Sequence, residues 1–180
     1  MGTKHPKLNR GLISFIEKQH LFFVGTAAPD GRVNISPKGL DSLRVIDENR
    51  LVWLNLTGSG NETAAHLKET KRMTIMFASF DKAPLILKLY GQATTINYSH
   101  EKWSELIDLF PEHPGARQIF DVTIDLVITS CGEAVPFYDF VGNRESLTAW
   151  SEEKGPDGIR DYWESTNQVS IDGKPTGILD

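Results

Sequence analysis

The spacing of apolar residues predicts one early helix followed by a series of short strands. Apolar positions recur at helical spacing within residues 8–20, so this segment is expected to form an amphipathic helix with Asn9 as its cap. Residues 21–27 are apolar and rich in strand formers, and a Pro-Asp-Gly turn joins them to an alternating segment at 33–37. The two segments predict a β-hairpin that stops at Pro37, because proline cannot donate to a central ladder.

The same two patterns continue as far as residue 129. Strand composition returns at residues 42–46, 51–57, 73–80, 85–96 and 120–129, whereas residues 62–71 and 99–110 have helical spacing. Hairpins therefore join most of the strands, and helices are confined to two connections and the ends. We expect a mainly β protein with helices, built as an antiparallel β-barrel of six or seven strands and not from alternating β and α units.

The C-terminal part differs in character from the barrel segments. Residues 136–140 read Pro-Phe-Tyr-Asp-Phe, two helices are predicted at 144–154 and 159–167, and residues 172–175 are typical of a tail. A small barrel has no interior place for the aromatic run. We therefore predict that this run lies against a partner subunit.

The whole chain, residues 1–180, fits a single domain, with its core at about residues 12–155 and a C-terminal helical extension at 144–170. Hydrophobic residues make up 39% of the chain and charged residues 24%, which is enough for a packed core. The net charge of −5 provides no positive field for nucleic acid or an anionic membrane, and no apolar run approaches the ~20 residues of a membrane span. The N-terminus lacks the apolar segment of a signal peptide, and a single cysteine excludes an intramolecular disulfide, so we expect a cytoplasmic protein.

The most informative stretch for chemistry is residues 55–67, where a strand passes through glycines and hydroxyl residues into a helix. Such a junction can hold a phosphate, because glycines allow close approach and the first N–H groups of a helix are unpaired. A capping box formed by Ser59 and Glu62 explains the same residues without a ligand, and it places a carboxylate where the anion would bind. The local pattern leaves both interpretations open.

A second candidate lies at the end of the alternating segment 33–37. Ser36, Pro37 and Lys38 place a hydroxyl and an ammonium group at one rim of the barrel, where the lysine can pair with a phosphate. The alternative is an ordinary exposed lysine after a strand. The two candidates strengthen each other, since both favour a phosphate-bearing ligand.

The other reactive residues form no pattern of a metal or catalytic site. The five histidines are scattered and there is no cysteine pair, so no metal site is expected, and His66 is interpreted as a surface or interface residue. Cys131 is interpreted as buried packing, since no activating neighbour is evident. Residues 57–61 only half match Gly-x-Ser-x-Gly, which disfavours a hydrolase, and no catalytic acid or base can be named.

Several of these stretches occur together in one known family. They include Asn-Ile-Ser-Pro-Lys-Gly at 34–39 and Leu-Thr-Gly-Ser-Gly-Asn-Glu at 56–62, and in full they are residues 15–26, 34–41, 53–67, 72–77, 89–93 and 130–136. In this order they resemble the FMN-binding split barrels of the pyridoxamine 5′-phosphate oxidase-like family, over about residues 12–155. The resemblance is to the broad bacterial subgroup related to that oxidase more than to the vitamin B6 enzyme itself.

The resemblance implies a homodimer of split barrels with FMN at the subunit interface. It places Ser36, Pro37 and Lys38 along the flavin, and Thr57, Ser59, Asn61 and Thr63 near its phosphate or ribityl chain; Tyr138 and Trp150 would pack on the ring from the partner chain. The basic cluster that holds the substrate phosphate in the vitamin B6 enzyme has no match here. Pyridoxamine 5′-phosphate is therefore not the expected substrate.

The resemblance thus implies an FMN-dependent oxidoreductase of the pyridoxamine 5′-phosphate oxidase-related class, acting on a small molecule. The flavin carries the hydride chemistry in such proteins, so the chain need supply only binding, orientation and hydrogen bonds. Two alternatives stay open, a flavin-binding or sensing protein without turnover and an interaction module that has lost its ligand.

Overall fold

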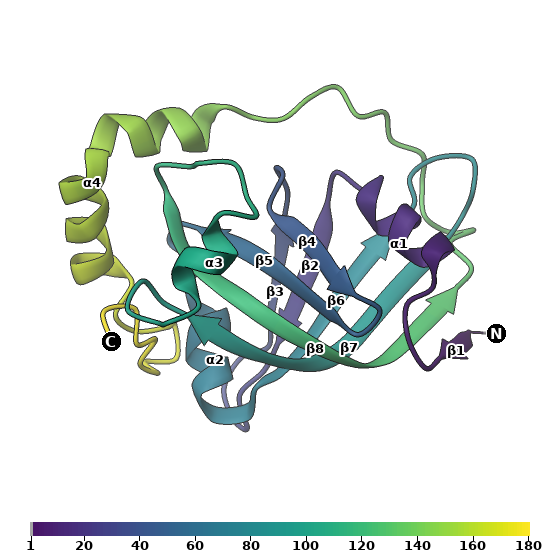
Figure 1. The fold of residues 1–180 in the computed structure, drawn as a ribbon, viewed down its shortest axis with the longest axis horizontal. Coiled ribbons are helices and arrows are strands. Elements are labelled where there is room, and N and C mark those ends of the chain that lie inside the picture. Colours follow the sequence, from purple (N-terminus) through teal and green to yellow (C-terminus); the bar gives the residue numbers. More distant parts are fainter. Residues whose placement is uncertain (1) are drawn as a thin grey trace.

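Residues 2–180 are described by the computed structural model, and they form one curled sheet with helices at its edges and ends (Figure 1). The strands are β1 (Thr3–His5), β2 (Phe22–Thr26), β3 (Asn34–Lys38), β4 (Leu43–Asp47), β5 (Arg50–Leu56), β6 (Arg72–Ala78), β7 (Ile86–Ile96) and β8 (Ala116–Ser130). The helices are α1 (Arg10–Glu17), α2 (Glu62–Thr70), α3 (Trp103–Ile107) and α4 (Ser146–Thr166).

All strand pairs are antiparallel, in the order β3-β2-β6-β7-β8-β5-β4, and β1 pairs with β8. Within residues 2–180, β3 and β4 end this path and do not pair with each other, so the sheet curls without closing. The prediction of an antiparallel split barrel is confirmed. The sheet has eight strands, one more than expected, because the three residues of β1 are too few to give a readable pattern.

Strand β5 joins two hydrophobic cores because both of its faces are buried. Leu51 and Trp53 pack inside the curl, and the Trp53 ring stacks on Phe120 with centroids 4.5 Å apart. Val52 and Leu54 point to the opposite face and pack in a second cluster beneath α3. The end of β5 is therefore held firmly, and the polar residues that follow it are fixed in place.

Helix α4 contains a kink at Gly155, whose φ of 63° is a left-handed conformation that glycine adopts without strain. Pro156 follows and cannot donate a helical hydrogen bond. The two predicted helices, 144–154 and 159–167, thus correspond to the two halves of α4. Trp163 in the second half is 8% exposed and packs with Ile159 and Ile178.

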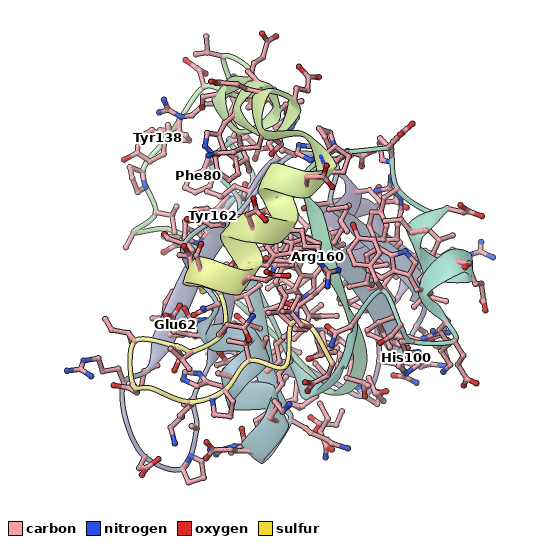
Figure 2. The ribbon with its side chains drawn as sticks, turned by 90° about the vertical axis from the view of Figure 1, so that its left-hand side faces the viewer. Glu62, Phe80, His100, Tyr138, Arg160 and Tyr162 are labelled. Atoms are coloured by element: carbon pink, nitrogen blue, oxygen red, sulfur yellow. The ribbon has the colours of Figure 1, made fainter. Side chains whose placement is uncertain are left out.

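The last residues, 167–180, form a strap against the sheet and α2, and the expectation of a tail at 172–175 is wrong. Asp172 pairs with Arg32 of the β2–β3 turn, and Lys174 pairs with Asp30 at 2.6 Å and with Glu69 at 2.9 Å. Figure 2 looks onto α4 and shows Glu62 at the start of α2 beside this strap. The polar residues that suggested a solvated tail are instead paired with charges far away in the sequence.

Candidate functional site

A cavity of about 610 Å³ lies where β3 and β5 end, beneath the segment that leads from β8 to α4. That segment, green in Figure 1, crosses the top of the sheet. Three cationic side chains, Lys38, Arg117 and Arg144, line the cavity, and no aspartate or glutamate does. Its apolar wall comes from Leu21, Leu40, Leu54, Leu56 and Leu147. The cavity is therefore a positively charged hollow with an apolar lining.

Arg117 forms the deep wall of the cavity and is only 2% exposed. Its Nη1 donates to the carbonyl oxygen of Gly58 at 2.9 Å and to Oδ1 of Asn167 at 3.0 Å, and its Nη2 donates to the carbonyl oxygen of Gly60 at 2.7 Å. In one orientation of its amide, Asn55 accepts from Nη2 at 2.8 Å and from Nε at 3.3 Å. All five donors are then filled by neutral acceptors, and no carboxylate contacts the guanidinium.

Burial lowers the pKa of Arg117 to about 10, since the charged form is separated from water. The side chain remains protonated at neutral pH. A buried positive charge thus faces the cavity, hydrogen-bonded only to carbonyl and amide groups, and the negative charge of Glu62 acts on it from outside the lining.

Lys38 is the second cation of the cavity, half-buried and placed by the alternation of β3. Its Nζ lies 5.4 Å from the centre of the Trp53 ring, a cation–π contact. It lies 3.4 Å from Oδ1 of Asn55 in the other amide orientation, so that one oxygen serves either Lys38 or Arg117. Burial, and then repulsion from Arg117, lower the pKa of Lys38 to about 8.

Of the other predicted cofactor-binding residues, Pro37 and Thr57 also line the cavity, together with the backbone of Gly58 and Gly60. The Thr57 hydroxyl accepts a hydrogen bond from the indole Nε1 of Trp163 at 2.9 Å, and its backbone N–H donates to Gly115 at 2.7 Å. The glycine-rich loop is thus held from behind by Trp163 and by the Arg117–Asn167 pair. Its shape is set by the chain itself.

Four more of these residues lie outside the cavity lining. Ser36 donates to Asn34 at 2.9 Å, and Asn34 donates to Thr63 at 3.1 Å. The Asn61 side chain donates to the carbonyl of Val169 at 2.8 Å, and Ser59 is exposed at the tip of the loop. Three of the four side chains therefore bind to the protein itself, which fixes β3 against α2.

The capping-box interpretation of Ser59 and Glu62 is wrong. Helix α2 begins at Glu62 with Asn61 as its N-cap, and no side chain makes the cap hydrogen bond. The Glu62 carboxylate accepts from the backbone N–H of Asn61 at 3.2 Å and from that of Ile171 at 3.4 Å. The carboxylate is thus used to fasten the C-terminal strap and does not line the cavity.

Tyr138 and Trp150 also lie away from the cavity within one chain. Tyr138 is 68% exposed and packs edge-on against Phe80, with centroids 5.4 Å apart (Figure 2). Trp150 packs against Tyr162 in the cluster of α4. Their contact with a flavin held by a partner chain stays a prediction.

Two expectations about reactive residues are wrong. His66 is fully buried, because α2 packs this face on β2, and its Nδ1 lies 3.1 Å from the Thr26 hydroxyl. Cys131 is exposed, because β8 ends at Ser130 and the chain turns outward. Among residues 2–180, no group of three or more histidine, cysteine, aspartate or glutamate side chains is arranged to hold a metal ion.

The sequence-based prediction missed four residues of the site: His20, Arg117, Phe140 and Arg144. The His20 and Phe140 rings are stacked at the cavity mouth, 3.7 Å apart and 8° from parallel. Arg117 was missed because β8 was expected to begin at residue 120, whereas it begins at Ala116. Extending the strand alternation backward would have placed Arg117 within the strand.

Comparison with known proteins identifies the family. Residues 12–131 match the model of the pyridoxamine 5′-phosphate oxidase family. The chain belongs to this family. It is 32% identical over 193 residues to the pyridoxamine 5′-phosphate oxidase family protein ustO of Aspergillus flavus, an alignment that covers 97% of this chain and 78% of that protein.

Solved structures show that the fold is shared with more distant members of the pyridoxamine 5′-phosphate oxidase family. A Lactobacillus delbrueckii protein described as a candidate pyridoxamine 5′-phosphate oxidase aligns with a TM-score of 0.56 at 18% identity, over 68% of this chain and 94% of that one. A pyridoxamine 5′-phosphate oxidase-related, FMN-binding protein of Nostoc punctiforme aligns with a TM-score of 0.51 at 14% identity, over 71% of this chain and 85% of that one. No helix within residues 2–180 has the length and apolar character needed to cross a membrane.

Proposed function

We propose that this chain binds FMN in the cationic cavity and acts as an FMN-dependent oxidoreductase. One observation carries the proposal: the buried Arg117 and the half-buried Lys38 face the cavity, with no carboxylate in its lining. Withdrawing an uncompensated charge from water costs several kcal/mol, and an anionic ligand recovers part of that cost. The phosphate of FMN is such an anion.

The residues present suit the whole cofactor as well as its phosphate. A volume of about 610 Å³ lies within the range of small-molecule sites, and the leucine-rich wall suits a flavin ring. Lys38, Thr57 and the backbone of the glycine loop would hold the cofactor, and Arg117 would hold that loop. FMN supplies hydride or electron transfer when bound, while the chain binds it, orients it and limits the access of water. Family membership and the FMN-binding description of the Nostoc punctiforme protein support this choice.

A flavin-binding protein without turnover is the second candidate. It is favoured by the lining itself, which offers no carboxylate as a general acid or base, and by His20, whose ring is stacked on Phe140. Flavin chemistry does not require such a group, so the oxidoreductase is retained as the leading proposal.

Two measurements on the purified protein test this proposal. We expect a flavin absorption spectrum that stays with the protein through gel filtration, and a protein that takes up no FMN would refute the cofactor. We also expect NADH or NADPH to reduce the bound flavin and an added acceptor to reoxidise it. If no combination of electron donor and acceptor reduces and reoxidises the bound flavin, the result would favour the binding protein without turnover.

We further propose that two copies of the chain form a dimer through the outer face of β2, β3, β6 and β7. A groove of about 550 Å³ runs over this face. Val33 directly precedes the edge strand β3 and is 71% exposed, and Ile35 lies within that strand and is 72% exposed. Exposed apolar side chains gathered on one face are typical of a protein interface.

A cytoplasmic location is part of the proposal, because the one cysteine is unpaired.

A further inference from the structure

The cavity rim carries polar side chains that the FMN proposal leaves without a partner. Asn143, Arg144 and Ser146, just before and at the start of α4, line the cavity. Within residues 2–180, none of these three side chains forms a hydrogen bond or an ion pair with another residue. Four other arginines do pair with carboxylates, namely Arg32, Arg44, Arg50 and Arg160. The rim therefore offers several free donors and one free cation.

The charges of the cavity do not balance against one phosphate. A phosphate monoester carries a charge of about −1.5 to −2 at pH 7. Lys38 and Arg117 together match that charge, and Arg144 is left over. No aspartate or glutamate lines the cavity to neutralise it. A second anionic group in the same cavity would complete the balance.

We infer that Arg144, with Asn143 and Ser146, forms a subsite for an oxyanion of the substrate, a carboxylate or a phosphate attached to an apolar body. This inference rests on the proposed function, because it assigns the deep cations to FMN. The planar guanidinium can bind two oxygens of such a group at once. An arginine at an open rim lets the ligand enter and leave.

The surroundings of Arg144 define the rest of the substrate. Leu147 and Leu40 line the cavity nearby, and the stacked rings of His20 and Phe140 close its mouth. These groups suit an apolar or aromatic body and offer no acid to bind a cation. The substrate class is therefore small organic acids with an apolar body.

Isothermal titration of the FMN-loaded protein tests the subsite with three probes. Benzoate carries a carboxylate on an aromatic ring, phenyl phosphate carries a phosphate on the same ring, and benzamide is the neutral counterpart. We expect benzoate or phenyl phosphate to bind at least about tenfold more tightly than benzamide, as a charge-assisted contact predicts. The tighter of the two anions distinguishes carboxylate from phosphate recognition.

Variants connect this preference to one residue. Arg144→Gln is expected to weaken binding of the preferred anion by about tenfold or more and to leave the affinity for benzamide unchanged. Arg144→Lys should retain part of the effect, because it keeps the charge. Arg160→Gln is the matched control, since Arg160 is an exposed arginine of α4 and does not line the cavity.

Equal binding of benzoate, phenyl phosphate and benzamide would overturn the subsite, and so would an Arg144→Gln protein that binds the anions like the parent. If the protein takes up no FMN, the proposed function fails separately. The same titrations on the ligand-free protein then decide the subsite by the same criteria.

Discussion

Two hollows of this molecule are nearly equal in volume but differ in chemistry. The cavity at the ends of β3 and β5 holds about 610 Å³ and is lined by three cations without an acid. The groove over β2, β3, β6 and β7 holds about 550 Å³, and its lining balances Arg72 with Asp125 among mostly apolar residues. Size alone therefore does not tell a ligand site from a contact surface. The cationic lining distinguishes the two, because keeping these charges away from water costs free energy that a bound anion can recover.

The largest expected effect comes from removing the deep cation with Arg117→Met. The change leaves the carbonyl of Gly60 and Oδ1 of Asn167 without their donor, at about 1–3 kcal/mol each, whereas the Gly58 carbonyl keeps its bond from Asn167 at 3.0 Å. It also relieves the burial of the charge, worth about 3 kcal/mol from the lowered pKa. We expect a net loss of about 2 kcal/mol of unfolding free energy in urea, and FMN affinity at least about a hundredfold lower.

Arg117→Lys is the control, since lysine keeps the charge but cannot fill five hydrogen bonds. It should retain more FMN affinity than Arg117→Met. Unchanged flavin binding in both variants would show that the cavity is not the anion site, and would remove the contrast with the groove.

The groove is tested by Ile35→Asp. In a twofold dimer this change places like charges on the same interface from both copies, at a cost of several kcal/mol. We expect the dimer dissociation constant, measured by analytical ultracentrifugation, to rise about a hundredfold. Ile46→Asp is the matched control, because Ile46 is also exposed and lies outside the groove. A parent protein that is monomeric with FMN bound would refute the interface.

Lys38 gives the cavity a pH dependence that the groove lacks. In the ligand-free protein the pKa of Lys38 is about 8, and a bound phosphate raises it. FMN binding above pH 8 therefore requires proton uptake, and the affinity should fall by up to about tenfold per pH unit. Lys38→Met should show a flat profile above pH 8 and an affinity about ten- to a hundredfold lower at pH 7. Binding of riboflavin, which lacks the phosphate, should depend much less on pH and on Lys38→Met when it is measured by equilibrium dialysis.

The same group affects the stability of the ligand-free protein. The folded pKa of about 8 lies below the ordinary lysine pKa of 10.5, so the unfolded chain binds more protons between these values. The charged Lys38 destabilises the folded protein fully below pH 8. The unfolding free energy of the parent, measured relative to that of Lys38→Met, should therefore rise from pH 8 toward pH 10.5. A parent and a variant with parallel stability profiles would contradict the burial of Lys38.

Ser59→Ala has the smallest expected effect. The family resemblance placed Ser59 near the phosphate or ribityl chain of FMN, but Ser59 is exposed and lies outside the cavity lining. Exposed substitutions of this kind change free energies by about 0.5 kcal/mol or less, so we expect a change in FMN affinity of about twofold. A tenfold loss in a fluorescence titration would instead show that the loop tip folds over the ligand.

Local pattern predicted most of the sheet, because alternation and turn residues report strands directly. It also predicted Lys38 and the glycine loop, which lie at strand ends where polar residues interrupt apolar runs. Arg117 was missed through a strand boundary. Arg144 was missed because the pattern predicted a helix over residues 144–154 but held no signal of where that helix would lie against the sheet. The strap was missed because the pairing of Asp172 with Arg32 spans the chain and leaves no local signal.

The residues that support the glycine loop of the cavity come later in the chain than the whole sheet, so they leave the ribosome after it. The final strand of the sheet ends at Ser130, yet the glycine loop is fastened by Trp163 and Asn167 and the hairpin tip by Asp172. At about 5–20 residues per second, the sheet can form while this support is still being synthesised. The barrel can thus form before its site is complete, and loading of the proposed FMN would follow the synthesis of residues 163–172.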